Sequence, residues 1–306
     1  MKISLAATLT VLVMLSACAT VPVDSTPALT TASTTTASVE SQRLKRYYSG
    51  VDSRLRAQGL LRTDGGGIDV PYSARNLVEN FEKIALYDEY TVRNGRFVAQ
   101  QTPSRLRRWT QPIRIKLLFG DHVPPDQRAR DTQNVAAFAA RLSSLTGLSI
   151  RLSNAKPNFH VLFLNRDEQR VFGPKLIAEV PRLNQVVIDE IVNSPRNTFC
   201  AAYAFSESEQ SSAYASAIIL VKAEHTDLMR LSCIHEEIAQ GLGLSNDSPA
   251  ARPSIFNDDE EFGLLTTHDE FLLRMLYDPR MRAGMDAAQA RAIANVIAGE
   301  YFASDS

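Results

Sequence analysis

The 306-residue sequence is poor in cysteine, with three in all, and has no excess charge of either sign. Three cysteines are too few for a disulfide-rich scaffold or a four-cysteine zinc site. The 33 lysines and arginines balance 34 aspartates and glutamates, so the composition argues against nucleic acid as a partner. The sequence also lacks a glycine-rich phosphate loop and any histidine pair at positions i and i+4. Paired histidine ligands on one helix are therefore excluded.

The N-terminal segment has the pattern of an export signal. A short positive start is followed by an apolar run over residues 3–15, which is too short to span a bilayer. The run ends in Leu15-Ser16-Ala17-Cys18. This ending resembles the bacterial lipobox, which implies removal of residues 1–17 and attachment of lipid to Cys18. The alternative is an ordinary secretory signal that happens to contain a cysteine.

The residue after the lipobox and the segment beyond it predict how the chain is held. Position 19 is alanine rather than aspartate, so the resemblance implies the outer membrane, on its periplasmic side or at the cell surface. Residues 19–42 carry 11 serines and threonines and two prolines, with few large apolar side chains. Such a segment buries too little surface to fold. Residues 18–42 are expected to be a lipidated cysteine and a disordered tether.

Residues 43–105 have the pattern of a small helical and hairpin layer. Apolar residues recur at steps of three and four in two stretches, and Asn94-Gly95 lies between extended residues. Helices are expected in residues 43–59 and 73–87, a loop in residues 63–68 and a hairpin in residues 91–98. This layer is expected to pack on the domain that follows.

Residues 106–303 alternate between strand and helix patterns. Five strands are expected, in residues 112–119, 148–153, 159–164, 200–205 and 217–222. Two long helices are expected, in residues 124–146 and 226–240. The order of these elements predicts an α+β or mixed α/β domain with one twisted sheet. A strand comes first, then a helix, several strands and a long helix.

The end of the second long helix carries a polar motif. Glu236 and Gln240 are four residues apart and share a helix face, and Glu237 lies one step round. Gly243 allows a sharp turn that brings Asn246 or the aspartate after it back toward this face. The alternative is a solvated polar face of an amphipathic helix.

This motif resembles the zinc motif of the metzincin metallopeptidases. Aligned with Glu237 as the catalytic glutamate, Glu236, Gln240 and Asn246 occupy the three histidine positions and Gly243 the position of the turn glycine. The resemblance, which extends over residues 106–278, implies a zincin-like domain in which that helix would carry the active site.

Two further stretches support the resemblance, and a second family is closer in overall pattern. Residues 108–115 resemble the first strand of matrixin-type catalytic domains, and Phe256 stands where that family places the methionine of its turn. The closer resemblance is to a proteobacterial lipoprotein family of unknown function (domain of unknown function 2927). Three segments carry it, residues 233–247, 254–258 and 276–280. That family implies an envelope location and brings no established activity.

The replaced histidines determine the functional hypotheses. Zinc sites of this type use neutral imidazoles, whereas carboxylate and amide oxygens suit calcium, magnesium or manganese better. No cofactor is expected, and a bound metal ion would not be zinc. The leading hypothesis is a non-catalytic pseudo-metallopeptidase that binds a peptide or another envelope component. The alternative is a metal-dependent hydrolase with Glu237 as general base. A lipoprotein with a purely structural role is the third.

The two cysteines that remain after Cys18 are expected to pair. An exported protein meets an oxidising compartment. Cys200 begins a predicted strand, and Cys233 lies in the helix that should pack on that sheet. We expect a disulfide between them; the alternative is two buried free thiols.

Other polar residues are expected to be structural. If His235 were a first zinc ligand, the second would be Ala239, which cannot coordinate, so His235 is expected to be an exposed or capped helix residue. The four acids of residues 258–261 lack the spacing of a calcium loop and indicate a solvated loop. Thr266 and Asp269 form a capping-box pattern.

Overall fold

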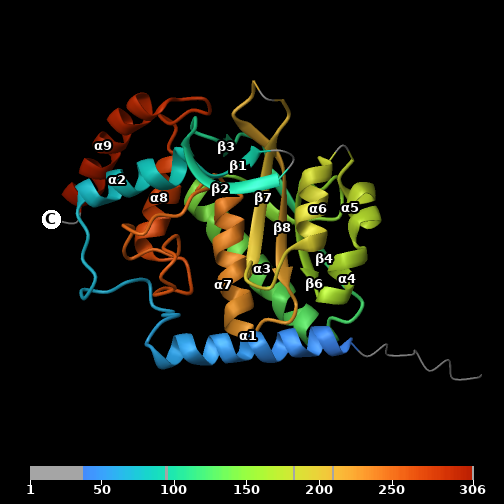
Figure 1. Ribbon diagram of the computed structural model, residues 1–306. Coiled ribbons are helices and arrows are strands. Elements are labelled where there is room, and N and C mark those ends of the chain that lie inside the picture. The colour runs from blue at the N-terminus through green and yellow to red at the C-terminus, as the bar shows by residue number, and fades with distance from the viewer. Residues whose placement is uncertain (1–36, 94–95, 182, 209, 305–306) are drawn as a thin grey trace, which may run out of the picture. The chain divides into compact units, whose positions relative to one another are not determined.

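The computed structural model describes residues 37–304 except 94–95, 182 and 209 (Figure 1). The predicted signal peptide, Cys18 and nearly all of the predicted tether lie outside the described residues, as does the Asn94-Gly95 turn. No helix in the described part of the chain is both long and apolar enough to span a membrane.

The first helix, α1 (Val39–Ala57), begins earlier than expected. The Ser38 hydroxyl accepts a hydrogen bond from the Ser41 backbone N–H and caps the helix. The Ser41 hydroxyl donates to the buried Glu224 carboxylate at 2.8 Å. The last residues of the predicted tether are therefore helical, because a cap and a buried partner hold them.

A single central sheet in a mixed α/β domain, as predicted, forms the centre of the fold, and the structure shows it to be mostly parallel. Its strands are β3 (Arg108–Trp109), β4 (Ile113–Phe119), β5 (Ile150–Leu152), β6 (Phe159–Leu164), β7 (Cys200–Ser206) and β8 (Ala213–Lys222). Strands β5, β4, β6 and β8 are parallel neighbours in that order, and β7 pairs antiparallel with β8. All six side chains of β6 are buried, which agrees with an interior strand.

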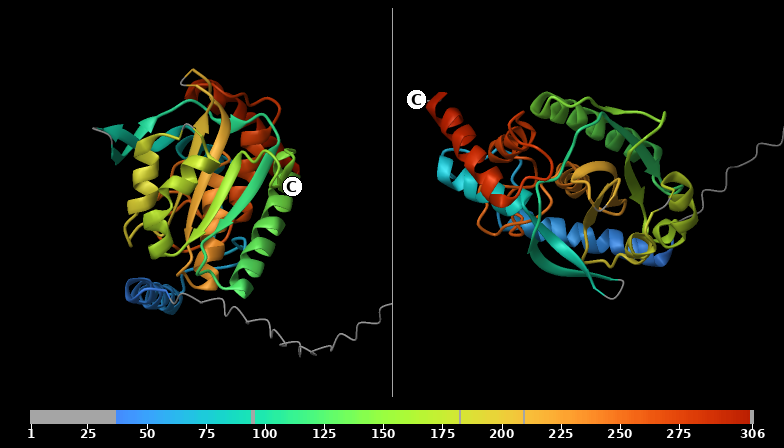
Figure 2. Two further views of the ribbon diagram at one scale, coloured as in Figure 1. Left: turned by 90° about the vertical axis from the view of Figure 1, so that its right-hand side faces the viewer. Right: turned by 90° about the horizontal axis from the view of Figure 1, so that it is seen from above.

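Helices cover both faces of the sheet (Figure 2). On β6, the side chains of Phe159 and Val161 enter the larger core, whereas Leu162 enters a smaller one. The larger core is closed by α2 (Ala74–Ala85), α3 (Pro125–Thr146), α7 (Asp227–Gln240), α8 (Thr267–Tyr277) and α9 (Ala287–Ser304). The smaller core is closed by α5 (Gly173–Glu179), by α6 (Gln185–Asn193) and by Phe172, which follows α4 (Arg166–Val171). The alternation of side chains along the strands thus produces a three-layer α/β fold.

A separate hairpin joins the helical layer to the sheet. Strands β1 (Tyr87–Arg93) and β2 (Arg96–Pro103) pair antiparallel, with Arg93 opposite Arg96, as the predicted hairpin requires. The first residues of β1 and the residues of β7 face a common pocket. The hairpin therefore contributes side chains to the same site as the sheet.

The end of α7 is fixed by close backbone contacts. The Trp109 indole N–H donates to the Gly241 carbonyl at 2.8 Å. Gly243 has φ +123° and lies against the Arg107 carbonyl, so the turn needs a residue without a side chain. This turn directs residues 245–247 back toward α7.

Candidate functional site

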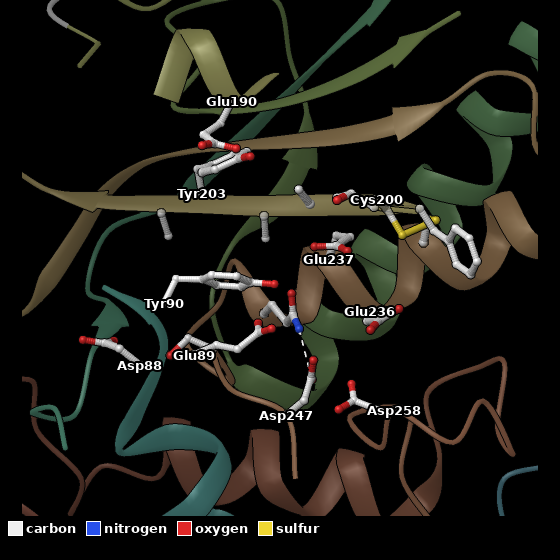
Figure 3. Close-up of a pocket in the computed structure, with 18 of the residues that line it drawn as sticks. Asp88, Glu89, Tyr90, Glu190, Cys200, Tyr203, Glu236, Glu237, Asp247 and Asp258 are labelled. Atoms are coloured by element: carbon white, nitrogen blue, oxygen red, sulfur yellow. Dashed lines mark hydrogen bonds between the residues drawn. A yellow bond between two sulfur atoms is a disulfide. The ribbon is translucent and has the colours of Figure 1, made fainter. Parts of the chain in front are cut away.

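A pocket of about 950 Å³ lies between β7, α7 and β1 (Figure 3). Residues 197–206 form one side, Asp88, Glu89 and Tyr90 come from β1, and α7 supplies residues from Met229 to Gln240. Parts of the loops after α7 complete the boundary. Three segments distant in sequence therefore meet at one cavity.

Carboxyl groups dominate the polar lining of this pocket. Eight of them line it: Asp88, Glu89, Glu190, Glu236, Glu237, Asp247, Asp258 and Glu260. Arg107 is the one basic residue among the described residues of the lining, and its guanidinium pairs with Asp88 at 3.0 Å. The remaining acids face the cavity without a basic side chain of the lining to balance them.

Glu237 is the most deeply placed of these acids. It is 5% exposed, and its buried Oε2 atom has no hydrogen-bond partner among the described residues. Burial, with added repulsion from Asp247 and Glu89, raises the pKa of Glu237 well above its usual range. Burial and the neighbouring Glu237 likewise raise the pKa of Glu236. The pair favours a protonated state or a bound cation.

Asp247 faces the same cavity from the turn after α7. Its Oδ1 accepts a hydrogen bond from the Gln240 amide at 3.2 Å. Burial, followed by the charges of Glu89 and Asp258, raises the pKa of Asp247 to about 7. The expected return of the chain toward the helix face is thus made by Asp247.

Asn246, which aligns with the third histidine of the metzincin motif, is directed elsewhere. Its backbone N–H donates to the Ile84 carbonyl at 3.1 Å, and its side-chain amide donates to the Lys83 carbonyl at 2.8 Å. These bonds fasten the turn to α2. Of the three aligned positions, Glu236 and Gln240 line the pocket, and Asn246 does not. Phe256 is fully buried in the larger core and is not part of the lining.

The predicted disulfide between Cys200 and Cys233 is present, with a Cα–Cα distance of 5.8 Å. It joins β7 to α7 on the wall of the pocket. Within the described residues, Cys200, Glu236 and Glu237 are the one group of three histidines, cysteines or acids whose ligand atoms lie within 4.8 Å of one another. The sulfur is not a thiolate in the disulfide, so the group offers a metal two carboxylates. These residues do not fit a zinc site.

His235 is buried, so the expectation of an exposed helix residue is wrong. Its ring stacks on Phe138 with a centroid distance of 4.1 Å, and its Nδ1 accepts from the Leu265 backbone N–H at 3.2 Å. Burial lowers its pKa to about 3, which keeps the imidazole neutral. The sequence pattern missed this because α3 covers a second side of α7.

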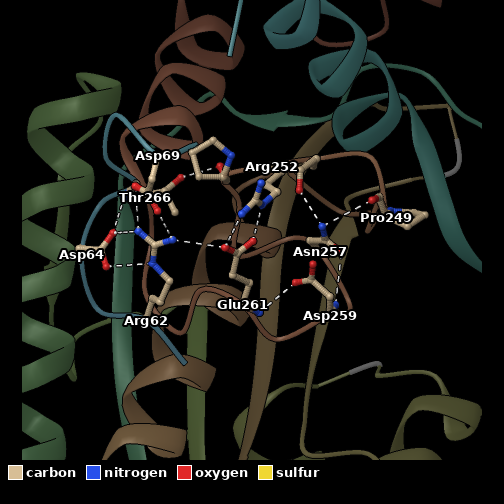
Figure 4. A network of polar contacts seen from close by, with 12 residues as sticks. Arg62, Asp64, Asp69, Pro249, Arg252, Asn257, Asp259, Glu261 and Thr266 are labelled. Atoms are coloured by element: carbon tan, nitrogen blue, oxygen red, sulfur yellow. Dashed lines mark hydrogen bonds and ion pairs between the residues drawn. The ribbon is translucent and has the colours of Figure 1, made fainter. Parts of the chain in front are cut away.

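The acidic run of residues 258–261 is divided between a structural network and the pocket (Figure 4). Glu261 accepts from Arg252 at 2.8 Å and from Arg62 at 3.3 Å. Arg62 also pairs with Asp64 at 2.9 Å and with Asp69 at 2.8 Å. These bonds hold the loop in place, while two other acids of the run, Asp258 and Glu260, line the pocket.

The predicted capping box at the start of α8 is confirmed. The Thr266 hydroxyl accepts from the Asp269 backbone N–H, and the Asp269 carboxylate accepts from the Thr266 backbone N–H at 3.0 Å. The same carboxylate accepts from the Ser254 hydroxyl at 2.6 Å. The box therefore also fixes the loop that precedes Phe256.

Several pocket residues were not predicted from the sequence. Glu89 and Tyr90 lie on a hairpin, and Glu190 lies on a helix of the opposite layer. One signal was available: adjacent acids at positions 88 and 89 are unusual in a strand. Their position across from α7 depends on tertiary packing, which no local pattern reports.

The acidic pocket predicts a stability that falls as pH rises. A carboxyl whose pKa is raised in the folded state loses its proton more readily in the unfolded chain, so each such group destabilises the fold as pH rises from about 4 through its folded pKa, by up to about 1.4 kcal/mol per pH unit. Asp247, with a folded pKa of about 7, faces Glu89, Asp258 and Gln240. We expect Asp247→Asn to reduce the loss of unfolding free energy between pH 5 and pH 8 in urea titrations.

A matched substitution outside the pocket provides the control for this pH effect. Asp126 on α3 is exposed, and its hydrogen bond with Arg130 lowers its pKa. Asp126→Asn should leave the decline between pH 5 and pH 8 in place. Equal slopes for the wild-type protein and Asp247→Asn would contradict the assignment.

Comparison with known proteins identifies a family. Residues 74–295 match the family model described as "Protein of unknown function (DUF2927)". Searches of curated proteins and of solved structures gave no match. The match covers well over half of the chain and includes β1, β7, α7 and all eight pocket carboxylates. The chain therefore belongs to the DUF2927 family of proteins of unknown function.

Proposed function

We propose that this protein binds an extended peptide segment along β7 without cleaving it. The observation that carries the proposal is the position of β7. Among the described residues, β7 pairs with β8 on one side, and its residues line the 950 Å³ pocket. The open edge of a strand presents backbone N–H and C=O groups that another strand can pair with.

The side chains around β7 support binding of a peptide rather than of a small rigid ligand. Tyr90 lies on the α7 side of β7 and Tyr203 on the opposite side, next to Glu190 (Figure 3). Both line the pocket and offer apolar surface with a polar tip. The resemblance of α7 to a metallopeptidase helix is consistent with a peptide in this position. Glu236 and Gln240 in place of histidines favour a degenerate, metallopeptidase-like domain that binds and does not hydrolyse.

The test is to select peptides and then locate them. Random seven-residue peptides displayed on phage should be enriched on the immobilised protein. An enriched synthetic peptide should slow hydrogen exchange of the backbone amides in residues 200–206. If enriched peptides protect only the opposite layer, residues 166–193, or if none is enriched, the proposal is wrong.

We further propose that the protein is held at the outer membrane by lipid on Cys18. The lipobox-like sequence before Cys18 and the serine- and threonine-rich segment after it support this proposal. Labelled palmitate should enter the wild-type protein and should be absent from Cys18→Ala. A soluble, unlipidated product from the intact gene would contradict lipid anchoring while leaving peptide binding untouched.

A second candidate function is a metal-dependent hydrolase with Glu237 as general base. The favouring observation is that Glu237 Oε2 is buried in the pocket wall and that no described residue forms a hydrogen bond with it. A raised carboxyl pKa suits proton transfer near neutral pH. A hard metal ion would take oxygens of Glu236 and Glu237 as ligands and would activate water.

Glu237→Gln separates binding from hydrolysis. The neutral amide has nearly the same shape and removes a buried acid of raised pKa, so the variant should fold and should melt at or above the wild-type temperature at pH 8. Enriched peptides incubated with wild-type protein, with calcium or manganese added, should be recovered intact by mass spectrometry. Cleavage that disappears in a folded Glu237→Gln protein would establish the hydrolase instead.

A further inference from the structure

The 950 Å³ pocket along β7 is called the β7 groove below. We propose that this groove selects peptides that carry a lysine or arginine, and that Glu236, Glu237 and Asp247 bind the cationic head of that side chain. This inference rests on the proposed peptide binding and adds the chemical class of the ligand. It follows from the charge of the lining, from one unsatisfied buried oxygen and from the distribution of the acids.

The lining of the groove has an excess of negative charge, which a bound cation would neutralise. Eight carboxyl groups line it, and the one arginine among the described lining residues already pairs with Asp88. Burying several negatively charged carboxylates together is unfavourable unless a positive charge lies among them or some of them bind protons. A basic side chain supplies that charge together with several hydrogen-bond donors.

Glu237 is an independent indication of a ligand. Its side chain is directed into the cavity from α7 (Figure 3), it is 95% buried, and its Oε2 has no hydrogen-bond partner in the part of the chain that the structure describes. Buried polar atoms are almost always satisfied. A guanidinium or ammonium group in the groove would supply the missing donor, with Asp247 on the far side of the same space.

The distribution of acids favours a basic side chain over a single metal ion. The carboxyl groups come from β1, α6, α7 and two loops and line the whole groove. In the described residues, the single tight group of three ligand atoms includes the sulfur of the Cys200–Cys233 disulfide, which leaves two carboxylates for a metal. Tyr90, which lies on the same side of β7 as Glu237 (Figure 3), provides ring surface for the aliphatic stem and cation–π contact for the head of a lysine or arginine.

The experiment compares peptides that differ in one charge. From the phage selection, the most enriched sequence is synthesised with lysine, norleucine or glutamate at its most strongly conserved basic position. Affinity for the purified protein is measured by calorimetry at two salt concentrations. Lysine should bind at least tenfold more tightly than norleucine, which matches its length without charge, and glutamate should not bind measurably.

Variants assign the effect to the groove. Glu237→Gln should reduce the preference for lysine over norleucine at least fivefold. Glu79→Gln removes the same charge from α2, outside the groove, and should change neither affinity. This control excludes an effect of net charge alone.

Each other outcome overturns the inference in a recognisable way. If peptides are enriched and protect β7 but show no basic preference, peptide binding stands and charge selection fails. If no peptide is enriched, both fail. If calcium or manganese alone binds at micromolar concentration and blocks the lysine peptide, and Glu237→Gln abolishes metal binding, the acids form a metal site.

Discussion

Replacing Gly243 by valine should unfold the protein or leave it barely stable. At φ +123°, a side chain is strained whatever surrounds it, and a Cβ atom would lie 2.3 Å from the Arg107 carbonyl oxygen and 3.1 Å from Leu276 Cδ2. Backbone strain costs about 1–3 kcal/mol and overpacking a similar amount. Together they come to about 2–6 kcal/mol, which reaches the lower end of the stability of a typical domain, about 5–15 kcal/mol. Circular dichroism melts and soluble yield measure the loss.

Gly147 offers a matched control for the backbone term. It ends α3 at φ +71°, and a Cβ atom there would have no neighbour within 4 Å. Gly147→Val should therefore lower the stability only through backbone strain, because the new side chain meets no neighbouring atom. The protein should remain folded. Should Gly243→Val prove no more destabilising than Gly147→Val, the contact with Arg107 would not be the decisive constraint on the turn.

Removing the Cys200–Cys233 disulfide should have the next largest effect. The bond closes a loop with a sequence separation of 33 residues, for which the loss of unfolded-state entropy corresponds to about 3–4 kcal/mol. The double variant Cys200→Ala/Cys233→Ala should therefore unfold at a lower urea concentration. Because the bond joins β7 to α7, peptide affinity in the groove should fall as well.

Adding a reductant to the wild-type protein separates the effect of losing the disulfide bond from the effect of replacing the two cysteine side chains. Dithiothreitol should destabilise the wild-type protein by about as much as the double substitution does, and it should have no effect on the double variant. Two thiols that are alkylated in the wild-type protein without reductant would show that the bond does not form in solution.

The sequence predicted the sheet and the helices α1, α2, α3 and α7, but not α9, because the patterns of the predicted elements depend on local burial. Alternation in β4, the continuous apolar run of β6 and the glycine that ends α3 each report which side of an element faces the core. The pairing of Cys200 with Cys233 followed from placing a strand against a helix. The strands and helices can be predicted without knowing how distant segments meet, and the disulfide required only that one helix pack on one strand.

The sequence did not predict the opposite helical layer or most of the pocket. The three helices α4, α5 and α6 have six, seven and nine residues, too short for a clear period. The buried state of His235 depends on Phe138 from another helix. The acids of β1 reach the pocket only through the placement of the hairpin. The features that were not predicted depend mainly on contacts between secondary-structure elements, whereas the predicted ones depend on patterns within a single element.

The order of strands in the sheet also determines when the groove can form. Among the sheet strands, β8 comes last in sequence, yet it lies between β6 and β7, with Phe159 paired to Ala217 and Cys200 to Val221. Pairings between such distant residues form slowly. A chain that stops before Ala213 leaves β7 with no strand to join. The groove is therefore completed late in folding, and nascent or truncated chains can contain most of the described helices without a complete groove.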